Sequence, residues 1–250
     1  MPELLSELDL DFYPSGDGEP MAETPIHVEA IMLLHQALED FFKDRPDVFI
    51  ASDIFWYFKE GSRSKTSRIS PDVMVVPGVT QREIYERRSF FSWVEERVPV
   101  AVFEMASRKT WRNDLGKKKD IYEKLGVKEY FLFDPEFRYL EAPLIGFRLR
   151  GKKYRQIPLA EGMISELGFR VTAERWMIRL IDSTTNEPVF TRAEALEQSQ
   201  ANEKMLERLV ESERLRAEAE RRLVNSERQR GDLLAAEVER LKKQLGRSAP

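Results

Sequence analysis

Residues 98–135, which read VPVAVFEMASRKTWRNDLGKKKDIYEKLGVKEYFLFDP, decide the fold of this chain. The segment opens and closes with continuous apolar runs, and such runs are typical of strands buried on both faces. The polar residues between them predict a helix over about 114–125, with Asp114 as its N-cap and Gly126 just past its end. A strand–helix–strand unit implies parallel strands joined by a right-handed crossover.

Further elements are predicted on both sides of this unit. Apolar residues at helical spacing indicate an early helix, and short runs rich in β-branched and aromatic residues indicate strands. The predicted elements are a helix from 25 to about 45, a strand or hairpin arm at 48–58, strands at 71–76, 98–103 and 129–133, and a hairpin with arms at 144–150 and 154–158. Together they predict an α/β fold.

The composition excludes several kinds of site. The chain has 250 residues, of which 42% are hydrophobic and 34% charged, and its net charge is −4. This balance argues against a chain that coats nucleic acid with uniform positive charge, although it allows a local basic cleft. The absence of cysteine excludes disulfides, thiolate zinc sites and cysteine nucleophiles. With only two histidines, we expect any metal to be a hard cation bound by carboxylates.

Changes of composition along the chain predict three segments. Residues 1–24 are acidic and rich in turn formers, residues 25–190 carry the aromatic side chains of a globular domain, and residues 191–250 read as one long charged helix. No apolar stretch is long enough to span a membrane. The first residues also lack the basic head and apolar run of a signal peptide. We therefore expect a soluble, cytoplasmic protein.

Three polar residues are expected to converge at the ends of the predicted strands. Asp72 stands at the start of a short strand, Glu104 interrupts the buried strand, and Lys118 lies on the helix that follows. Two neighbouring carboxylates become stable together when a divalent cation lies between them. A nearby lysine could then orient or deprotonate a water molecule, or stabilise charge that develops on a phosphate.

Each of these residues also has a purely structural reading. Asp72 follows Pro71 and could simply form a turn. Asp114, Lys118 and Tyr122 are spaced i, i+4, i+8 and share one face of the helix, where the first two could pair and the third could pack. The spacing alone leaves both readings open.

The same residues stand in a pattern that resembles the Uma-two family. The pattern comprises Pro71-Asp72 and its apolar run, Glu104-Met-Ala-Ser107, and the stretch 114–135, which ends in Asp134-Pro135. This family consists of restriction-endonuclease-like proteins of the PD-(D/E)XK nuclease superfamily, and residues 13–23 resemble its cyanobacterial members. The resemblance implies a mixed central sheet flanked by helices, a Mg²⁺ (or Mn²⁺) cofactor and hydrolysis of phosphodiester bonds in DNA.

The resemblance also assigns roles to individual residues. Asp72 and Glu104 match the two metal-binding acids and Lys118 the catalytic lysine. The superfamily pattern places that lysine two residues after the second acid, where this chain has Ala106. The resemblance implies that a lysine of the following helix replaces it, which matches Lys118, and Lys109 on the intervening loop is a rival.

Lesser candidates lie around the predicted site. Glu29 is either a further metal-binding acid or a solvated helix residue, and Asp53 either supports the site or hydrogen-bonds at a strand edge. His27 and His35 are expected to lie on a helix face or in the core. The basic and aromatic residues that would suit a phosphate backbone and a stacked base are Arg63, Lys65, Arg68, Arg108, Lys109, Arg112 and Trp111.

The C-terminal helix is predicted to form a partial coiled coil. An apolar seam runs through Leu206, Val210, Ala217, Val224, Leu234, Val238, Leu241 and Leu245, and its register also places Glu213, Glu220, Glu227 and Gly231 on the seam. The seam is therefore weak in its centre and strong near its end. We expect a homodimer through this helix, which would suit an enzyme that cuts two strands.

Two other functions remain open from the residues alone. Ala106 and the long helix are compatible with a scaffold or binding protein that keeps the nuclease fold without catalysis. The same acids would also suit a phosphodiesterase that acts on RNA or on a small nucleotide.

Overall fold

The computed structural model describes residues 12–16, 24–80, 88–158 and 163–247, and most of the predicted acidic segment 1–24 lies outside this part. The chain divides into two compact units, Met1–Thr191 and Arg192–Pro250.

A six-stranded mixed sheet forms the centre of the first unit. Across the sheet the strands are β1 (Val48–Ser52), β4 (Val73–Pro77), β6 (Ala101–Met105), β7 (Glu129–Phe133), β8 (Leu144–Arg150) and β9 (Lys153–Gln156). β6 and β7 are parallel, whereas the other neighbouring strands are antiparallel. The predicted parallel crossover unit and the predicted β8–β9 hairpin are therefore confirmed.

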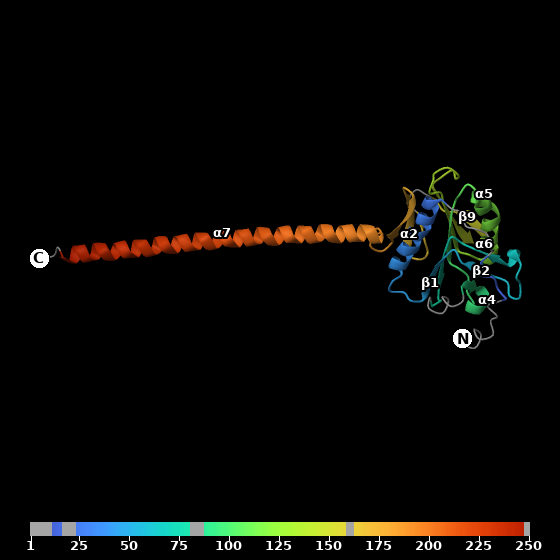
Figure 1. Ribbon diagram of the computed structural model, residues 1–250, viewed down its shortest axis with the longest axis horizontal. Coiled ribbons are helices and arrows are strands. Elements are labelled where there is room, and N and C mark those ends of the chain that lie inside the picture. Colours follow the sequence, from blue (N-terminus) through green and yellow to red (C-terminus); the bar gives the residue numbers. More distant parts are fainter. Residues whose placement is uncertain (1–11, 17–23, 81–87, 159–162, 248–250) are drawn as a thin grey trace. The chain divides into compact units, whose positions relative to one another are not determined.

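Both faces of this sheet are covered. Helix α2 (Pro25–Phe41) lies on one side and the helices that connect β6 to β7 lie on the other (Figure 1). Side chains of β4 alternate between the two sides: Val73 and Val75 belong to the core under α2, and Met74 and Val76 to the opposite core. The strands are apolar on both faces because each face packs against another layer.

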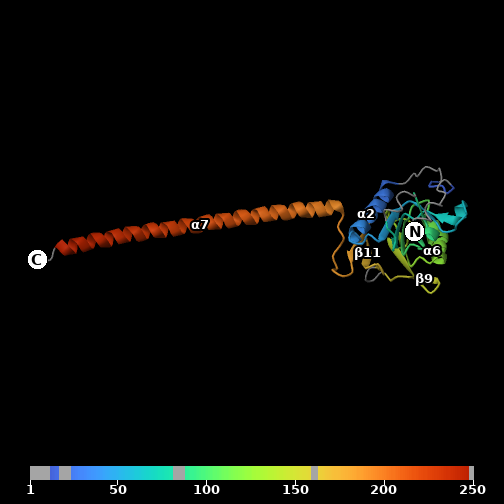
Figure 2. The ribbon, with the colours of Figure 1, turned by 90° about the horizontal axis from the view of Figure 1, so that it is seen from below.

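Two small sheets complete the layers. On the α2 side stand β10 (Met163–Ile164), β11 (Phe169–Glu174) and β12 (Met177–Asp182) (Figure 2). Apolar residues of β11 and β12 join the core under α2. The second small sheet contains β3 (Arg68–Ile69), β2 (Phe55–Tyr57) and β5 (Ser89–Phe91), with η1 (Lys65–Ser67) before β3 and α4 (Ser92–Glu95) after β5.

The prediction of a single strand or hairpin arm over 48–58 is wrong. β1 and β2 belong to different sheets, and the chain turns between them at Asp53, whose φ is 58°. Aspartate tolerates this left-handed conformation better than most residues because its short polar side chain can bond locally. The turn also lets the Asp53 N–H donate to the carbonyl of Pro71, at 3.2 Å.

The crossover helix begins earlier than predicted. It consists of α5 (Trp111–Asn113), a π-helical turn η3 (Asp114–Lys118) and α6 (Lys119–Leu125). The prediction that Asp114 is the N-cap is wrong. Asp114 lies inside the helix, with φ −68° and ψ −44°, and is fully buried. Gly126 ends the helix with φ 86°, as predicted.

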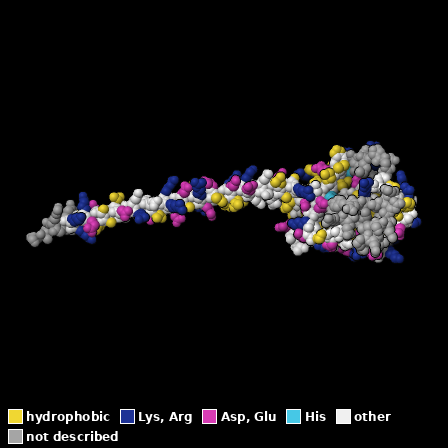
Figure 3. Space-filling model, turned by 60° about the horizontal axis from the view of Figure 1, so that its bottom comes forward, with side chains coloured by type: hydrophobic (Ala, Val, Ile, Leu, Met, Phe, Trp, Pro, Cys, Tyr) yellow, Lys and Arg dark blue, Asp and Glu magenta, His cyan; other side chains and the backbone are white. Residues whose placement is uncertain are grey.

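The second unit is the helix α7 (Arg192–Arg247), which confirms the predicted long helix. Lysine, arginine and acidic side chains alternate with small apolar groups along it (Figure 3). Among the residues that the structure describes, no helix is long and apolar enough to cross a membrane.

The left-handed conformation of Gly126 predicts a stability effect of defined sign. Gly126→Ala should lower the free energy of unfolding by about 1 kcal/mol, because an L side chain is strained at this φ. Urea unfolding followed by tryptophan fluorescence measures it, since all four tryptophans lie in the first unit.

Gly116→Ala is the matched control. Gly116 lies within the π-helical turn, and an added Cβ there meets nothing within 4 Å. This substitution should leave the free energy of unfolding unchanged or raise it, because alanine has the better helix propensity. Equal losses in both variants would contradict the conformational explanation.

Candidate active site

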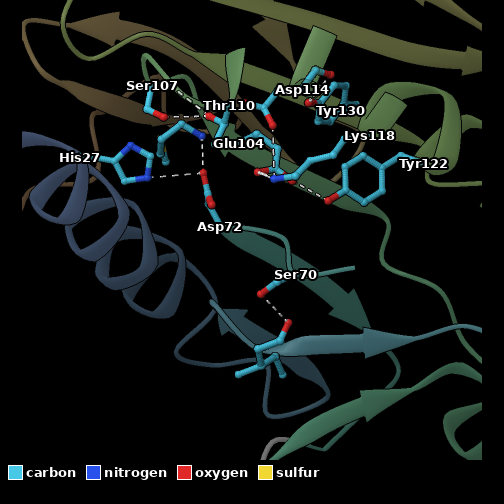
Figure 4. Close-up of polar contacts among 12 residues, drawn as sticks. His27, Ser70, Asp72, Glu104, Ser107, Thr110, Asp114, Lys118, Tyr122 and Tyr130 are labelled. Atoms are coloured by element: carbon cyan, nitrogen blue, oxygen red, sulfur yellow. Dashed lines mark hydrogen bonds and ion pairs between the residues drawn. The ribbon is translucent and has the colours of Figure 1, made fainter. Parts of the chain in front are cut away.

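The two predicted acids lie at the same end of neighbouring strands. Asp72 directly precedes β4, Glu104 lies in β6, and Val73 pairs with Phe103 across the ladder. The Asp72 carboxylate accepts a hydrogen bond from the backbone N–H of Met105 at 2.6 Å. Asp72 is therefore fixed against the strand segment that carries Glu104 (Figure 4).

Lys118 joins the acids from the crossover helix. Its Nζ donates to Glu104 Oε2 at 2.7 Å and lies 3.3 Å from Asp114 Oδ1. The Lys118 side chain is 16% exposed, whereas that of Glu104 is 1% exposed. The structure thus brings Asp72, Glu104 and Lys118 into one cluster, in which Glu104 is buried and the Lys118 side chain is partly exposed.

Two tyrosines complete the hydrogen bonds of the cluster. The Tyr122 hydroxyl donates to Glu104 Oε1 at 2.5 Å, so both oxygens of this carboxylate have a donor. The Tyr130 hydroxyl donates to the backbone carbonyl of Asp114 at 3.0 Å. Asp114, Lys118 and Tyr122 lie along one side of the helix, as their spacing predicts, and that side faces Glu104.

Burial governs the electrostatics of the cluster. It raises the pKa of Glu104 well above the usual range, and Asp72 and Asp114 raise it further, while Lys118 acts in the opposite direction. Burial acts to lower the pKa of Lys118, but the charges of Glu104, Asp72 and Asp114 outweigh it and raise that pKa above its ordinary value. Lys118 is therefore held as a cation, which suits it to stabilise negative charge rather than to accept a proton.

His27 was expected on a helix face or in the core, and the structure places it beside the cluster. It is buried on α2, and its Nε2 lies 3.9 Å from Asp72 Oδ2. Its burial agrees with the prediction, but its approach to Asp72 was not predicted. The available signal was its spacing, because His27 shares the helical face of Ile31, Leu34 and Leu38, which pack against the sheet.

The other candidates lie apart from the cluster. Lys109 and Glu29 are exposed, and among the described residues neither has a contact that joins it to Glu104 or Asp72. Asp53 is exposed at the end of β1. His35 instead contacts Ser52, with its Nδ1 2.7 Å from the Ser52 hydroxyl. Between the two candidate lysines, the geometry favours Lys118.

Two further buried acids have structural partners. Glu129 pairs with Arg148 at 2.7 Å and accepts the N–H of Glu166. Asp134 organises the turn after β7, because its carboxylate accepts backbone N–H groups, including that of Arg138 at 2.8 Å. Asp134 therefore has a structural role in the turn that follows β7.

The donor set of the cluster suits a hard cation. Asp72 and Glu104 offer carboxylate oxygens, and each oxygen that already accepts one hydrogen bond keeps a further lone pair. No group of three or more His, Asp or Glu side chains within the described ranges is arranged to hold a metal ion. Two carboxylates with water in the remaining positions match the way in which Mg²⁺ binds to proteins. These residues therefore fit a hard divalent cation better than a cation that needs a closed cage of side chains.

Comparison with known proteins identifies the family. A family model described as "Uma2: Putative restriction endonuclease" matches residues 6–174. The chain belongs to the Uma2 family. This confirms the resemblance and, at the level of the family description, a nuclease. The Uma2 region includes the whole cluster and ends before α7.

Further comparisons concern curated proteins and solved structures. No curated protein matches this Uma2 member. It is similar to the chain titled "Crystal structure of a putative nuclease belonging to DUF820 from Anabaena variabilis ATCC 29413", with 13% sequence identity, a TM-score of 0.40, and coverage of 60% of this chain and 79% of that one.

The raised pKa of Glu104 predicts how stability depends on pH. The folded protein keeps the Glu104 proton to a higher pH than the unfolded chain, whose pKa lies near the ordinary 4.5. Unfolding therefore releases a proton, and the stability that Glu104 contributes falls as the pH rises above 4.5 toward the folded pKa. The free energy of unfolding of the wild type relative to Glu104→Gln, measured in EDTA by urea titration across this range, should decrease with pH.

Glu123→Gln is the control of opposite sign. A hydrogen bond from Lys153 and the N–H of Tyr154 lower the pKa of Glu123. Stability contributed by Glu123 is therefore present above its ordinary pKa and is lost as the pH falls. If the two variants respond to pH in the same direction, the assignment of the shift to burial of Glu104 is wrong.

Proposed function

We propose that this Uma2 protein is a metal-dependent endonuclease that hydrolyses phosphodiester bonds in DNA. The observation that carries the proposal is the buried pair of Glu104 and Lys118 beside Asp72. Burial of a charged pair is an expensive way to stabilise a fold, because apolar residues of similar volume often serve as well. A pKa that is strongly shifted by burial and by a charged partner, as that of Glu104 is, is typical of functional sites.

The proposed roles follow from the contacts. Asp72 and Glu104 would hold Mg²⁺ or Mn²⁺, and the hydrogen bond from Met105 keeps the Asp72 carboxylate in place. When bound, the cation supplies Lewis-acid stabilisation of charge on the phosphoryl oxygens. Tyr122 fixes the orientation of Glu104 through its bond to Oε1.

Lys118 has a separate proposed role. An ammonium group has three donors. Lys118 Nζ donates one to Glu104, and Asp114 Oδ1 lies within ion-pair distance at 3.3 Å. A remaining donor can bind a phosphate oxygen or the attacking water. The neighbouring acids keep the amine protonated, so Lys118 would stabilise the charge that develops during hydrolysis.

Cleavage of supercoiled plasmid DNA tests these roles. The wild type should cut DNA with Mg²⁺ or Mn²⁺ and not with EDTA. Asp72→Asn, Glu104→Gln and Lys118→Met should each lower the rate by about a hundredfold or more, because each removes a group that stabilises the transition state.

Matched substitutions outside the cluster control for charge. Lys43→Met and Asp44→Asn change exposed residues and should leave the rate within a few fold of the wild type. Tryptophan fluorescence checks that each variant folds. A folded wild type that cuts no DNA would defeat the proposal and favour the scaffold, to which the buried Ala106 also points. Cleavage of RNA or of a small nucleotide alone would favour the phosphodiesterase.

We further propose that α7 pairs two copies of the chain. Several of its seam residues are exposed, for example Leu234 at 61% and Val224 at 56%. A second copy offers the same heptad register, so the apolar layers near the end of the helix would meet apolar layers in a parallel pair. Two copies would also supply two active sites for the two strands of a duplex.

Substitution of a seam residue tests the pairing in the full chain. Leu234→Glu should convert a dimer into a monomer in light-scattering chromatography, because it places charge in the apolar seam. Leu233→Glu, next to the seam and 73% exposed, is the control that should leave the dimer intact. A monomeric wild type would show that α7 does not pair in this way.

A further inference from the structure

A cavity of about 320 Å³ opens next to the cluster. One wall comes from η1 and β3, which precede the Asp72 segment, and the other from the crossover helix. Its lining residues are Lys65, Thr66, Arg68, Ile69, Asn113, Lys117, Lys118 and Ile121. We call this cavity the basic groove.

The charge of the basic groove has one sign. Four of its lining residues are cations, namely Lys65, Arg68, Lys117 and Lys118, and none is acidic. In a chain of net charge −4, such a concentration of positive charge is local rather than general. A second cavity, of about 240 Å³, has apolar residues of β1 in its wall and Arg88 as its one permanently charged residue. The basic groove is therefore suited to an anion, and the second cavity is not.

The cations of the basic groove differ in how they are held. Arg68 is fixed, because its Nη1 donates to the Tyr57 hydroxyl at 3.0 Å and its guanidinium lies 4.5 Å from the centre of the Phe55 ring. Lys65 and Lys117 are exposed, and the contacts of the described residues include no ion pair for either. Their ammonium groups thus remain available to a ligand.

Lys118 belongs to both the basic groove and the cluster. It lines the groove while its Nζ bonds Glu104, and the adjacent Lys117 lines the same groove from the π-helical turn. An anion in the groove therefore lies next to the residues proposed to hold the cation. Thr66 and Asn113 add neutral hydrogen-bonding groups along the walls.

We infer that the basic groove binds the phosphodiester backbone of a DNA strand beside the scissile phosphate. This inference rests on the proposed function, since it names the surface that would carry the substrate into that site. Lysines on two separate walls, with no acid between them, match a ligand that repeats its negative charge along a chain. The contacts are to phosphates, so binding should depend on salt and little on sequence.

Salt-dependent binding tests the basic groove without cleavage. The probe is a fluorescein-labelled DNA duplex, titrated with the full chain in EDTA and followed by anisotropy at several salt concentrations. Lys65→Ala combined with Lys117→Ala should raise the Kd by about tenfold near 0.1 M salt and reduce the slope of log K against log salt by about two, because each lysine neutralises one phosphate.

Lys43→Ala combined with Lys152→Ala is the matched control. Both residues are exposed, and neither lines the basic groove, so the pair removes the same net charge elsewhere. The control should keep the wild-type slope and Kd. If both double variants lose affinity equally, or if the wild type binds no DNA, the inference is overturned. Tighter binding of an RNA of the same sequence would overturn the choice of DNA.

The binding and cleavage experiments fail independently. If DNA binds through Lys65 and Lys117 but is never cut, the inference stands as a binding site and the endonuclease does not. The Lys65→Ala, Lys117→Ala variant could instead cut DNA at the wild-type rate and keep the wild-type slope of log K against log salt. The proposed function would then stand, and the assignment of DNA binding to the basic groove would be wrong.

Discussion

The first unit depends on how one buried carboxylate is neutralised. Glu104 lies in a strand whose residues are all buried, and a charge in such a place costs several kcal/mol unless it is paired and hydrogen-bonded. Lys118 and Tyr122 meet this need from a single helix. The crossover helix is therefore held on the sheet by its contacts with Glu104 as well as by apolar packing. Only a few positions of the helix on the sheet allow both kinds of contact.

The π-helical turn is the local device that meets this requirement. π-helical turns are rare, and they occur mostly as single turns inside α-helices, frequently at functional sites. Here the turn covers Asp114–Lys118, the residues that supply two of the charges in the cluster. Immediately after it, α6 resumes and brings Tyr122 to the same carboxylate. The change of helical register thus lies at the residues that contribute charged side chains to the cluster.

The sequence predicts those parts of the fold that follow from local patterns. The buried strands β6 and β7 are continuous apolar runs, and Gly126 marks the helix end, so the crossover unit could be read directly. Asp114 could not, because a polar residue before a helix normally caps it, and its burial depends on packing against the sheet, where the Tyr130 hydroxyl of β7 donates to the Asp114 carbonyl. The turn at Asp53 could not be predicted either, because a left-handed conformation at one residue does not change the pattern of apolar residues.

For the candidate site, sequence patterns provide residue types and spacing but not partners. The i, i+4, i+8 pattern correctly gives the face that Lys118 shares with Tyr122, whereas His27 approaches Asp72 from a helix far away in the chain. Lys118 also stands where two regions of opposite charge meet, acids inward and the basic groove outward. A divalent cation among the acids would weaken their repulsion of a polyanion in the groove. A polyanion in the groove would likewise weaken the repulsion between its cationic residues and the divalent cation. Each would strengthen the affinity of the other by the same factor, because coupling between two binding sites is reciprocal.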